Sequence, residues 1–162
     1  MGAGQRSGQR LARNQPDGGY FVAQDSAFQQ GAISQTINGL TPGNSYTVSF
    51  WWAAAQQEGF DGATQSQWQV SLGSQTQSTA FANIPHHGFS GWIHQSFTYT
   101  ATSSNEVLSF FANGSPQVPP FALLDGVTLN SSAPEPGTIT LMATGLMGAI
   151  GAVRRYRAKK RS

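Results

Sequence analysis

Hydrophobic and polar residues alternate with a period of two along the middle of the chain, the pattern of strands that bury one face. Turn-forming sequences rich in Gly, Pro, Asn and Asp separate these stretches. The pattern predicts eight strands, at residues 20–24, 32–38, 45–54, 67–72, 76–82, 92–101, 106–112 and 121–129. This number of short strands predicts an all-β fold, a two-sheet antiparallel sandwich of the jelly-roll type. A seven-strand fibronectin type III domain is the alternative, and the strand count favours the jelly roll.

The side-chain parity of these strands predicts a core and a polar outer face. Tyr46, Val48, Phe50 and Trp52 point one way, whereas Trp51 points the other way among Thr and Ser. The same parity places Trp68 inside. The outward positions of three strands combine two indoles with amides and an imidazole, a mixture that suits the C–H faces and hydroxyl groups of a sugar. These candidate glycan-binding residues are Trp51, Gln67, Gln69, Trp92 and His94. In the alternative interpretation, loops cover both Trp.

Composition supports one folded domain with appendages. The 162 residues are 38% hydrophobic and include ten Phe, four Trp and four Tyr, enough for a core and too many for a disordered chain. Only 10% of the residues are charged and 19 are Gly, which favours strands and turns over a helical bundle. The absence of Cys excludes disulfides, Cys-based zinc sites and thiol catalysis.

All nine Lys and Arg lie at the two ends of the chain. Residues 14–153 contain seven Asp and Glu and no basic residue, so their formal charge is −7. Such a body offers phosphates no counter-charge, which excludes nucleic acid as a partner. If the body binds a polysaccharide, we expect a neutral or weakly basic one.

The C-terminus has the features of a membrane anchor. Residues 136–153 form an uncharged run of eighteen residues, which as a helix would be about 27 Å long, close to a hydrocarbon core of about 30 Å. Six Lys and Arg follow within residues 154–161 and would keep that end in the cytoplasm. The sequence therefore predicts a transmembrane helix with the body outside. A buried Gly- and Ala-rich helix with a solvated basic tail is the alternative.

The order of these parts, with Ala133-Pro134-Glu135-Pro136 before the apolar run, resembles the PEP-CTERM sorting signal of Gram-negative bacteria. The resemblance implies an exosortase as partner. It also implies an inner-membrane location with the body outside the cytoplasm, then the cell surface or extracellular matrix after processing. The implied sorting signal consists of Pro134, Glu135, Pro136, Arg154, Arg155 and Arg157.

The expected organisation follows from these features. We expect a disordered basic N-terminus at 1–16, the β-sandwich at 17–131, a linker with Pro-Glu-Pro at 132–137, the transmembrane helix at 138–153 and a basic cytoplasmic tail at 154–162. Residues 1–14 hold three Arg but no apolar stretch, so they are no secretory signal peptide. We interpret the chain as a truncated product of a longer protein and expect that it is not exported by itself.

Three stretches of the body resemble the galactose-binding-like jelly rolls of exported bacterial proteins and carbohydrate-binding modules. They are residues 31–37, 39–50 and 121–129. In such modules a structural Ca²⁺ often lies where the first and last strands adjoin, so Asp25 and Asp125 are candidate ligands. Alternatively, Asp25 is a turn cap and Asp125-Gly126 a bulge.

Catalytic motifs are missing from the sequence, so no catalytic residue is predicted. Gly88-Phe-Ser-Gly91 does not match the nucleophile elbow Gly-x-Ser-x-Gly. Glu58 and Asp61 share one turn, whereas paired glycosidase carboxylates usually come from separate elements. His86, His87 and His94 lack the spacing of a known metal site and are interpreted as solvent-exposed.

The expected function is that of a non-enzymatic exported surface or exopolysaccharide-associated protein, sorted and processed by an exosortase. One alternative is a carbohydrate-binding accessory module that uses Trp51 and Trp92. A glycoside hydrolase that uses Glu58 and Asp61 is the other alternative. No cofactor is expected beyond the candidate Ca²⁺.

Overall fold

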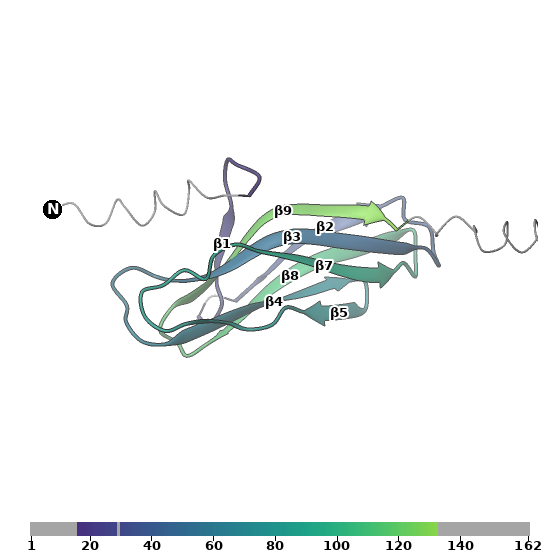
Figure 1. Ribbon diagram of the computed structural model, residues 1–162. Coiled ribbons are helices and arrows are strands. Elements are labelled where there is room, and N and C mark those ends of the chain that lie inside the picture. Colours follow the sequence, from purple (N-terminus) through teal and green to yellow (C-terminus); the bar gives the residue numbers. More distant parts are fainter. Residues whose placement is uncertain (1–15, 29, 133–162) are drawn as a thin grey trace, which may run out of the picture. The chain divides into compact units, whose positions relative to one another are not determined.

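The computed structural model describes residues 16–28 and 30–132, which form a sandwich of two β-sheets (Figure 1). The strands are β1 (Val22–Asp25), β2 (Ala32–Asn38), β3 (Ser45–Gln56), β4 (Thr64–Leu72), β5 (Gln75–Ser78), β6 (Ala82–Ile84), β7 (Ile93–Thr100), β8 (Asn105–Ser115) and β9 (Pro120–Ser131). The first sheet has the order β1-β9-β3-β7 and is called sheet A here. Sheet B has the order β2-β8-β4-β5, and β6 also pairs with β4. The pairings are antiparallel, so the predicted two-sheet antiparallel sandwich is confirmed.

One strand predicted from the sequence, 76–82, is instead two short strands that pair with different parts of β4. β5 pairs with residues 69–72 and β6 with residues 64–66. Between them Thr79 continues the ladder with its side chain: its Oγ1 accepts a hydrogen bond from the Trp68 backbone N–H at 3.0 Å, and its own N–H donates to the Trp68 carbonyl oxygen at 2.9 Å. A side-chain oxygen thus replaces one backbone acceptor, which alternation alone does not reveal.

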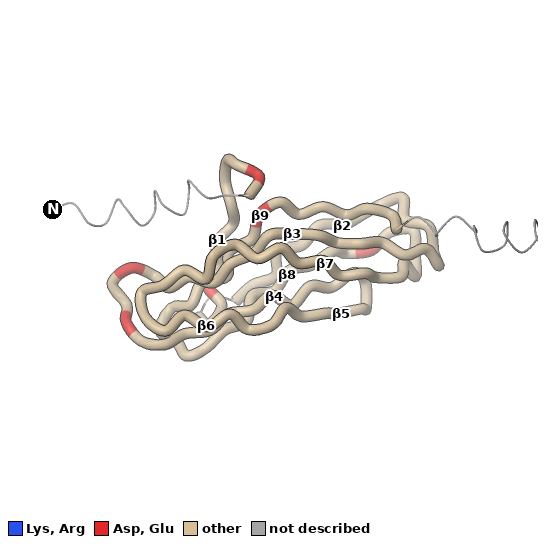
Figure 2. Tube along the Cα trace, in the orientation of Figure 1, with Lys and Arg blue, Asp and Glu red and all other residues tan. Residues whose placement is uncertain are grey.

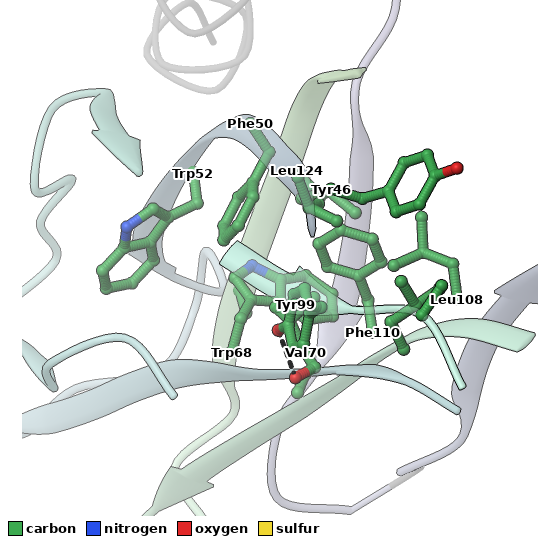
Figure 3. Packing of buried hydrophobic residues seen from close by; sticks show 14 of the residues in the cluster. Tyr46, Phe50, Trp52, Trp68, Val70, Tyr99, Leu108, Phe110 and Leu124 are labelled. Carbon is green, nitrogen blue, oxygen red and sulfur yellow. Dashed lines mark hydrogen bonds between the residues drawn. The ribbon is translucent and has the colours of Figure 1, made fainter. Parts of the chain in front are cut away.

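The core lies between the sheets and follows the predicted parity (Figure 3). Val48, Phe50 and Trp52 of β3 are almost completely buried, and Trp68 of β4 has no exposed surface. Phe110 of β8 contacts both Phe50 and Trp68 edge to face, with ring centroids 5.2 and 6.0 Å apart. These rings belong to the main hydrophobic cluster, and their burial favours the folded state.

Two side-chain hydrogen bonds cross the core from one sheet to the other. The Tyr99 hydroxyl of β7 donates to the Val70 carbonyl oxygen of β4 at 2.7 Å (Figure 3). The Trp68 Nε1–H donates to the Leu123 carbonyl oxygen of β9 at 3.1 Å. Both polar groups are therefore satisfied within the apolar interior, as burial requires.

A bulge interrupts β9 opposite Phe50. Ser49 pairs with Thr128 but Trp51 pairs with Asp125, so Gly126 and Val127 both lie opposite Phe50. Gly126 has a φ of +58°, a backbone conformation that glycine adopts without strain. The extra residue changes the parity of β9, and as a result Leu124 and Leu129 both pack toward the core.

The loops gather at two ends of the sandwich (Figure 1). The β3–β4 loop (57–63) and the β6–β7 loop (85–92) lie at the end where β9 begins, because Gln56 pairs with Pro120. The β4–β5 turn and the β7–β8 loop lie at the other end, where β9 finishes beside the start of β3.

Several regions named in the sequence analysis lie outside the described residues. They are the N-terminus up to residue 15, the Pro-Glu-Pro sequence, the expected transmembrane helix 138–153 and the basic tail. Within 16–28 and 30–132, no helix has the length and apolar character needed to cross a membrane.

Candidate functional site

The outer face of sheet A changes from polar to apolar along its length. At the end where β9 finishes, hydroxyl groups of neighbouring strands pair: Ser49 Oγ and Ser96 Oγ are 2.8 Å apart, and Thr47 Oγ1 and Thr98 Oγ1 are 3.3 Å apart. At the other end, a second hydrophobic cluster covers the sheet. It comprises Phe21, Ala53, Ala55, Phe89, Trp92, Phe121 and Leu123.

Trp51 lies at the boundary between these two regions. In the ladder it has His94 of β7 on one side and Asp125 of β9 on the other. The indole and the His94 imidazole contact each other with ring centroids 4.9 Å apart and an angle of 57° between the rings. Trp51 is half-buried and lies outside both hydrophobic clusters. The predicted outward position of this indole among polar side chains is thus confirmed.

Gly126 provides the space that this indole occupies. A Cβ atom at position 126 would be 3.2 Å from Trp51 Cδ1 and 2.9 Å from the Asp17 carboxyl carbon. Asp125 directly precedes Gly126 in the chain. Its Oδ1 accepts a hydrogen bond from the Gly126 N–H at 2.9 Å, while its buried Oδ2 has no partner within the described part of the chain. An aromatic ring and two carboxylates are therefore neighbours at this corner of sheet A.

Trp92, in contrast, is a half-buried member of the second hydrophobic cluster. Its ring meets Phe21 at 5.6 Å and Phe89 at 6.1 Å between centroids, both edge to face. Its Nε1 is buried and lacks a hydrogen-bond partner among the described residues. The predicted role of Trp92 as an open stacking platform fits this packing poorly, because Phe21 and Phe89 already contact the ring.

The structure does not bring Gln67 and Gln69 to the same face as Trp51. They alternate in β4 with the buried Trp68 and Val70, so they point outward from sheet B. The outer faces of the two sheets of a sandwich point in opposite directions. Parity distinguishes inside from outside within one strand, but it cannot tell which sheet the strand joins. The predicted set is therefore reduced to Trp51 and His94 on one face.

Asp25 and Asp125 do not share one site either. Asp25 pairs with Phe121, four positions along β9 from Asp125, a separation of about 13 Å at ~3.3 Å per residue. The Asp25 Oδ1 instead accepts hydrogen bonds from the N–H groups of Ala27 and Phe28, at 2.8 and 2.9 Å. Asp25 is thus the turn cap, and Asp125-Gly126 the bulge, of the alternative interpretation. A Ca²⁺ bound by both carboxylates is not supported.

Sequence reasoning missed a hollow beside Asp125. It has a volume of about 330 Å³ and is lined by residues of both sheets, including Ile33, Gln35, Phe110, Asp125 and Val127, together with Tyr20. Tyr20 is 98% exposed. The hollow adjoins the Trp51 corner through Gly126. No sequence pattern marks it, because it depends on how the edges of two sheets meet.

A model of the family described as "Protein of unknown function (DUF642)" matches residues 1–130. The chain belongs to the DUF642 family. A second model, the PEP-CTERM protein-sorting motif, matches residues 132–155 of this DUF642 protein. The match includes Pro134, Glu135, Pro136, Arg154 and Arg155, so the expected PEP-CTERM motif is confirmed. No curated protein matches the DUF642 chain in sequence.

The structure of this DUF642 protein is similar to solved structures that include three with sugar-binding or carbohydrate-binding titles. The EclA C-terminal domain, titled a sugar-binding protein, is 17% identical, with 68% of this chain and 77% of that chain covered and a TM-score of 0.45. TmCBM61 in complex with β-1,4-galactotriose is 16% identical, with 76% and 78% covered and a TM-score of 0.46. A family 16 carbohydrate-binding module is 13% identical, with 67% and 74% covered and a TM-score of 0.38. What each protein binds is a property of that protein.

The loops at the opposite end from Ser131 hold a second group of polar side chains in the DUF642 domain. His86 Nδ1 and Asp61 Oδ1 form a hydrogen bond between the β6–β7 and β3–β4 loops. This hydrogen bond lowers the pKa of the Asp61 carboxyl from its usual value of 3.8. The general acid of a glycoside hydrolase needs a raised pKa instead. Sequence reasoning treated Asp61 and His86 separately and did not find that they meet.

Proposed function

We propose that this DUF642 protein is a non-enzymatic exported surface or exopolysaccharide-associated protein that an exosortase sorts and processes. The observation that carries the proposal is the match of the sorting motif to residues 132–155, directly after the last strand of the sandwich. A folded body followed by such a motif suits a protein that is held at the membrane during export and then released from it. The β-sandwich acts at the cell surface, and the motif directs the sorting of the chain to that location.

Each part of this C-terminal signal has a separate role. Pro134, Glu135 and Pro136 are the recognition sequence of the exosortase. The uncharged residues 138–153 anchor the chain in the inner membrane, and Arg154, Arg155 and Arg157 keep that end in the cytoplasm. The body is then outside the cytoplasm and reaches the cell surface or extracellular matrix after processing.

The test replaces Pro134, Glu135 and Pro136 together by Ala in the full chain. An apolar signal peptide is fused before Met1, and the protein is expressed in an exosortase-containing host. We expect the unchanged chain to appear as a shorter form outside the inner membrane, and the variant to stay full-length in the membrane fraction. The control Asn130→Ala changes an exposed residue of β9 outside the motif and should be processed normally. Equal size and location of the variant and the unchanged chain contradict the proposal.

A second function, binding of a neutral polysaccharide, is favoured by Trp51. Its half-buried indole lies beside His94 and close to the paired Ser49 and Ser96 hydroxyls. A sugar ring needs both an aromatic plane for its C–H face and polar groups for its hydroxyls. The described body has six acidic residues and no Lys or Arg. Figure 2 accordingly shows red segments and no blue ones on this body, so an anionic glycan would be repelled. A neutral glycan is compatible with this charge.

A glycan array with the purified full chain tests the second function. If a neutral glycan binds to the Trp51 face, Trp51→Ala should weaken it by at least about fivefold, or about 1 kcal/mol, because one stacking partner is lost. Phe81→Ala removes an aromatic side chain that is 43% exposed elsewhere on the body and should leave binding unchanged. Equal binding by Trp51→Ala and the unchanged chain, or no neutral glycan bound, overturns this function.

A further inference from the structure

Three metal-ligating side chains converge at the end of the sandwich where β9 begins. Asp61 comes from the β3–β4 loop, and His86 and His87 come from the β6–β7 loop, 25 residues later in the chain. One ligand atom of each residue lies within 4.8 Å of those of the other two. The two imidazoles contact each other with ring centroids 4.2 Å apart. A single ion among these three atoms would reach all of them with small side-chain rotations.

The two loops are fixed to each other beside this group. Gln56, the last residue of β3, donates from its Nε2 to the Gly62 carbonyl oxygen at 3.0 Å. Its Oε1 accepts a hydrogen bond from the His87 N–H at 2.8 Å. One amide side chain therefore joins the neighbour of Asp61 to the backbone of His87, and this link holds the ligands on separate loops at a set spacing.

The β6–β7 loop is also joined directly to the end of β3. The Gln56 N–H donates to the Gly88 carbonyl oxygen at 3.2 Å, and the Ser90 N–H donates to the Ala54 carbonyl oxygen at 2.9 Å. Ser90 Oγ in turn accepts from the Ala54 N–H at 2.9 Å. The residues that directly follow the histidines are thus anchored to β3 of sheet A, and β6, which precedes them, pairs with β4 of sheet B.

His87 adopts an unusual backbone conformation. Its φ is +38°, and among residues 16–28 and 30–132 it is the only residue other than glycine with a positive φ. A residue with a Cβ atom is uncommon there, and the cost of such strain is of the order of 1 kcal/mol or more. Glycine would fit this backbone without strain. A His at this position places an imidazole next to that of His86, which a glycine could not do.

We propose that Asp61, His86 and His87 bind a divalent transition metal ion of the zinc class. Two imidazole nitrogens and one carboxylate oxygen are the ligands that Zn²⁺ accepts, with bonds of about 2.0–2.2 Å. Calcium prefers a shell of six or more oxygens, which this group does not provide. Three protein ligands leave the fourth position of a tetrahedral ion to water or to an oxygen of a bound partner.

A hydrogen-bonded pair of His86 and Asp61 does not by itself account for the position of His87. A structural pair of His86 and Asp61 would need no third ligand, and His87 would then carry its strained backbone for no purpose. The group is exposed, with 63% of the His86 and 66% of the Asp61 side chain accessible. The ion therefore reaches the site directly from solvent, and the ligands keep their hydration when the ion is absent.

The experiment measures Zn²⁺ binding to the full chain by competition with a chromophoric zinc indicator. The chain is purified without a polyhistidine tag, since a tag would itself bind zinc. We expect one Zn²⁺ per chain and a rise of the melting temperature on addition of zinc, because the ion binds the folded state. The triple variant Asp61→Asn, His86→Asn and His87→Gly is the reference. If the unchanged chain binds no more zinc than this variant does, the proposal is overturned.

Single variants separate this site from unspecific binding. Asp61→Asn keeps the shape of the side chain, and His87→Gly fits the left-handed backbone, so both retain the fold. Each should weaken zinc binding at least tenfold and abolish the thermal shift. His94→Ala removes the third histidine of the chain, on sheet A, and should bind zinc as the unchanged protein does. An equal loss in His94→Ala, or no loss in Asp61→Asn and His87→Gly, contradicts the assignment.

Discussion

Tyr99 of β7 and Val70 of β4 join the two sheets through a 2.7 Å hydrogen bond that lies inside the hydrophobic core. Tyr99 is 1% exposed, and burial of the hydroxyl raises its pKa from 10.0 to about 12. The protonated hydroxyl is thus required both for the hydrogen bond and for the packing. This relationship makes the stability of the sandwich sensitive to alkali.

Tyr99→Phe should lower the free energy of unfolding by about 1 kcal/mol at neutral pH, because one buried hydrogen bond is lost. The raised pKa contributes stability that is fully present below pH 10, the usual tyrosine pKa, and is lost as the pH rises toward 12. The difference between the two proteins should therefore shrink between pH 8 and pH 11. Urea unfolding at these two pH values measures it, and an unchanged difference contradicts the prediction.

Glu106 should stabilise the end of the sandwich that holds the β7–β8 loop, and this stabilisation should depend on pH. Its Oε1 accepts hydrogen bonds from the Thr102 hydroxyl and the N–H groups of Thr102 and Ser103, and these bonds lower the pKa of the carboxyl from 4.5. A lowered pKa gives stability that is present above pH 4.5 and is lost as the pH falls below it.

Replacement of Glu106 by Gln should therefore destabilise the protein at pH 7, by roughly 1–3 kcal/mol for hydrogen bonds to a charged group, and less at pH 3. Chemical unfolding at both pH values measures the two differences. Glu58→Gln changes an exposed carboxylate of the β3–β4 loop and serves as the control. Equal destabilisation by Glu106→Gln at pH 7 and pH 3 would show that the charge is not involved.

Gly114 of β8 should tolerate no side chain. A Cβ atom there would be 2.5 Å from Ser26 Oγ and 2.6 Å from the Gln65 carbonyl oxygen. Ser26 is fully buried and bound to Ser66 Oγ at 2.8 Å and to the Pro120 carbonyl oxygen at 2.7 Å, so it cannot move aside. Gly114→Ala should cost about 1–3 kcal/mol, the usual cost of overpacking.

Gly31→Ala is the matched control for this change, since no atom lies within 4 Å of a Cβ atom placed there. Thermal unfolding of both variants compares them directly. If Gly31→Ala lowers the melting temperature as much as Gly114→Ala does, the contact with Ser26 is not the cause.

The tryptophans should differ in their effect on stability. Trp68→Ala should cost about 3–5 kcal/mol, because it empties the centre of the core and removes the hydrogen bond to Leu123. Trp92→Ala should cost less, about 2 kcal/mol, since its ring is only half-buried between Phe21 and Phe89. Trp51→Ala should cost the least of the three. Denaturant unfolding gives this order, and a Trp51→Ala variant as unstable as Trp68→Ala would place Trp51 in the core.

The sequence was sufficient to predict the sandwich because burial on one face imposes a period of two. The bounds of β2 agree with the predicted strand 32–38, and the parity of β3 and β4 is confirmed by the buried Phe50 and Trp68. The division of 76–82 into two strands could not be predicted. It depends on Thr79, whose side chain takes the place of a backbone acceptor.

The candidate sites were less predictable than the fold. Trp51 and His94 were expected on one face because both strands show clear alternation, and the structure confirms that they touch. Gln67 and Gln69 were expected with them, but strand order decides which sheet a residue joins, and alternation contains no information about strand order. The meeting of Asp61 with His86 and His87 was missed for the same reason, because two loops become neighbours only through the pairing of distant strands.

Strand β9 runs between the two ends of the described body where the loops gather. It runs from Pro120, beside Gln56 and the histidine-bearing loop, to Ser131, one residue before the sorting motif begins. Twelve residues at ~3.3 Å each make a path of roughly 35–40 Å. This path is hydrogen-bonded to neighbouring strands along its length, so it cannot shorten or bend as a flexible linker does. The sandwich therefore holds the Asp61 loop about one strand length away from Ser131, the residue directly before the sorting motif.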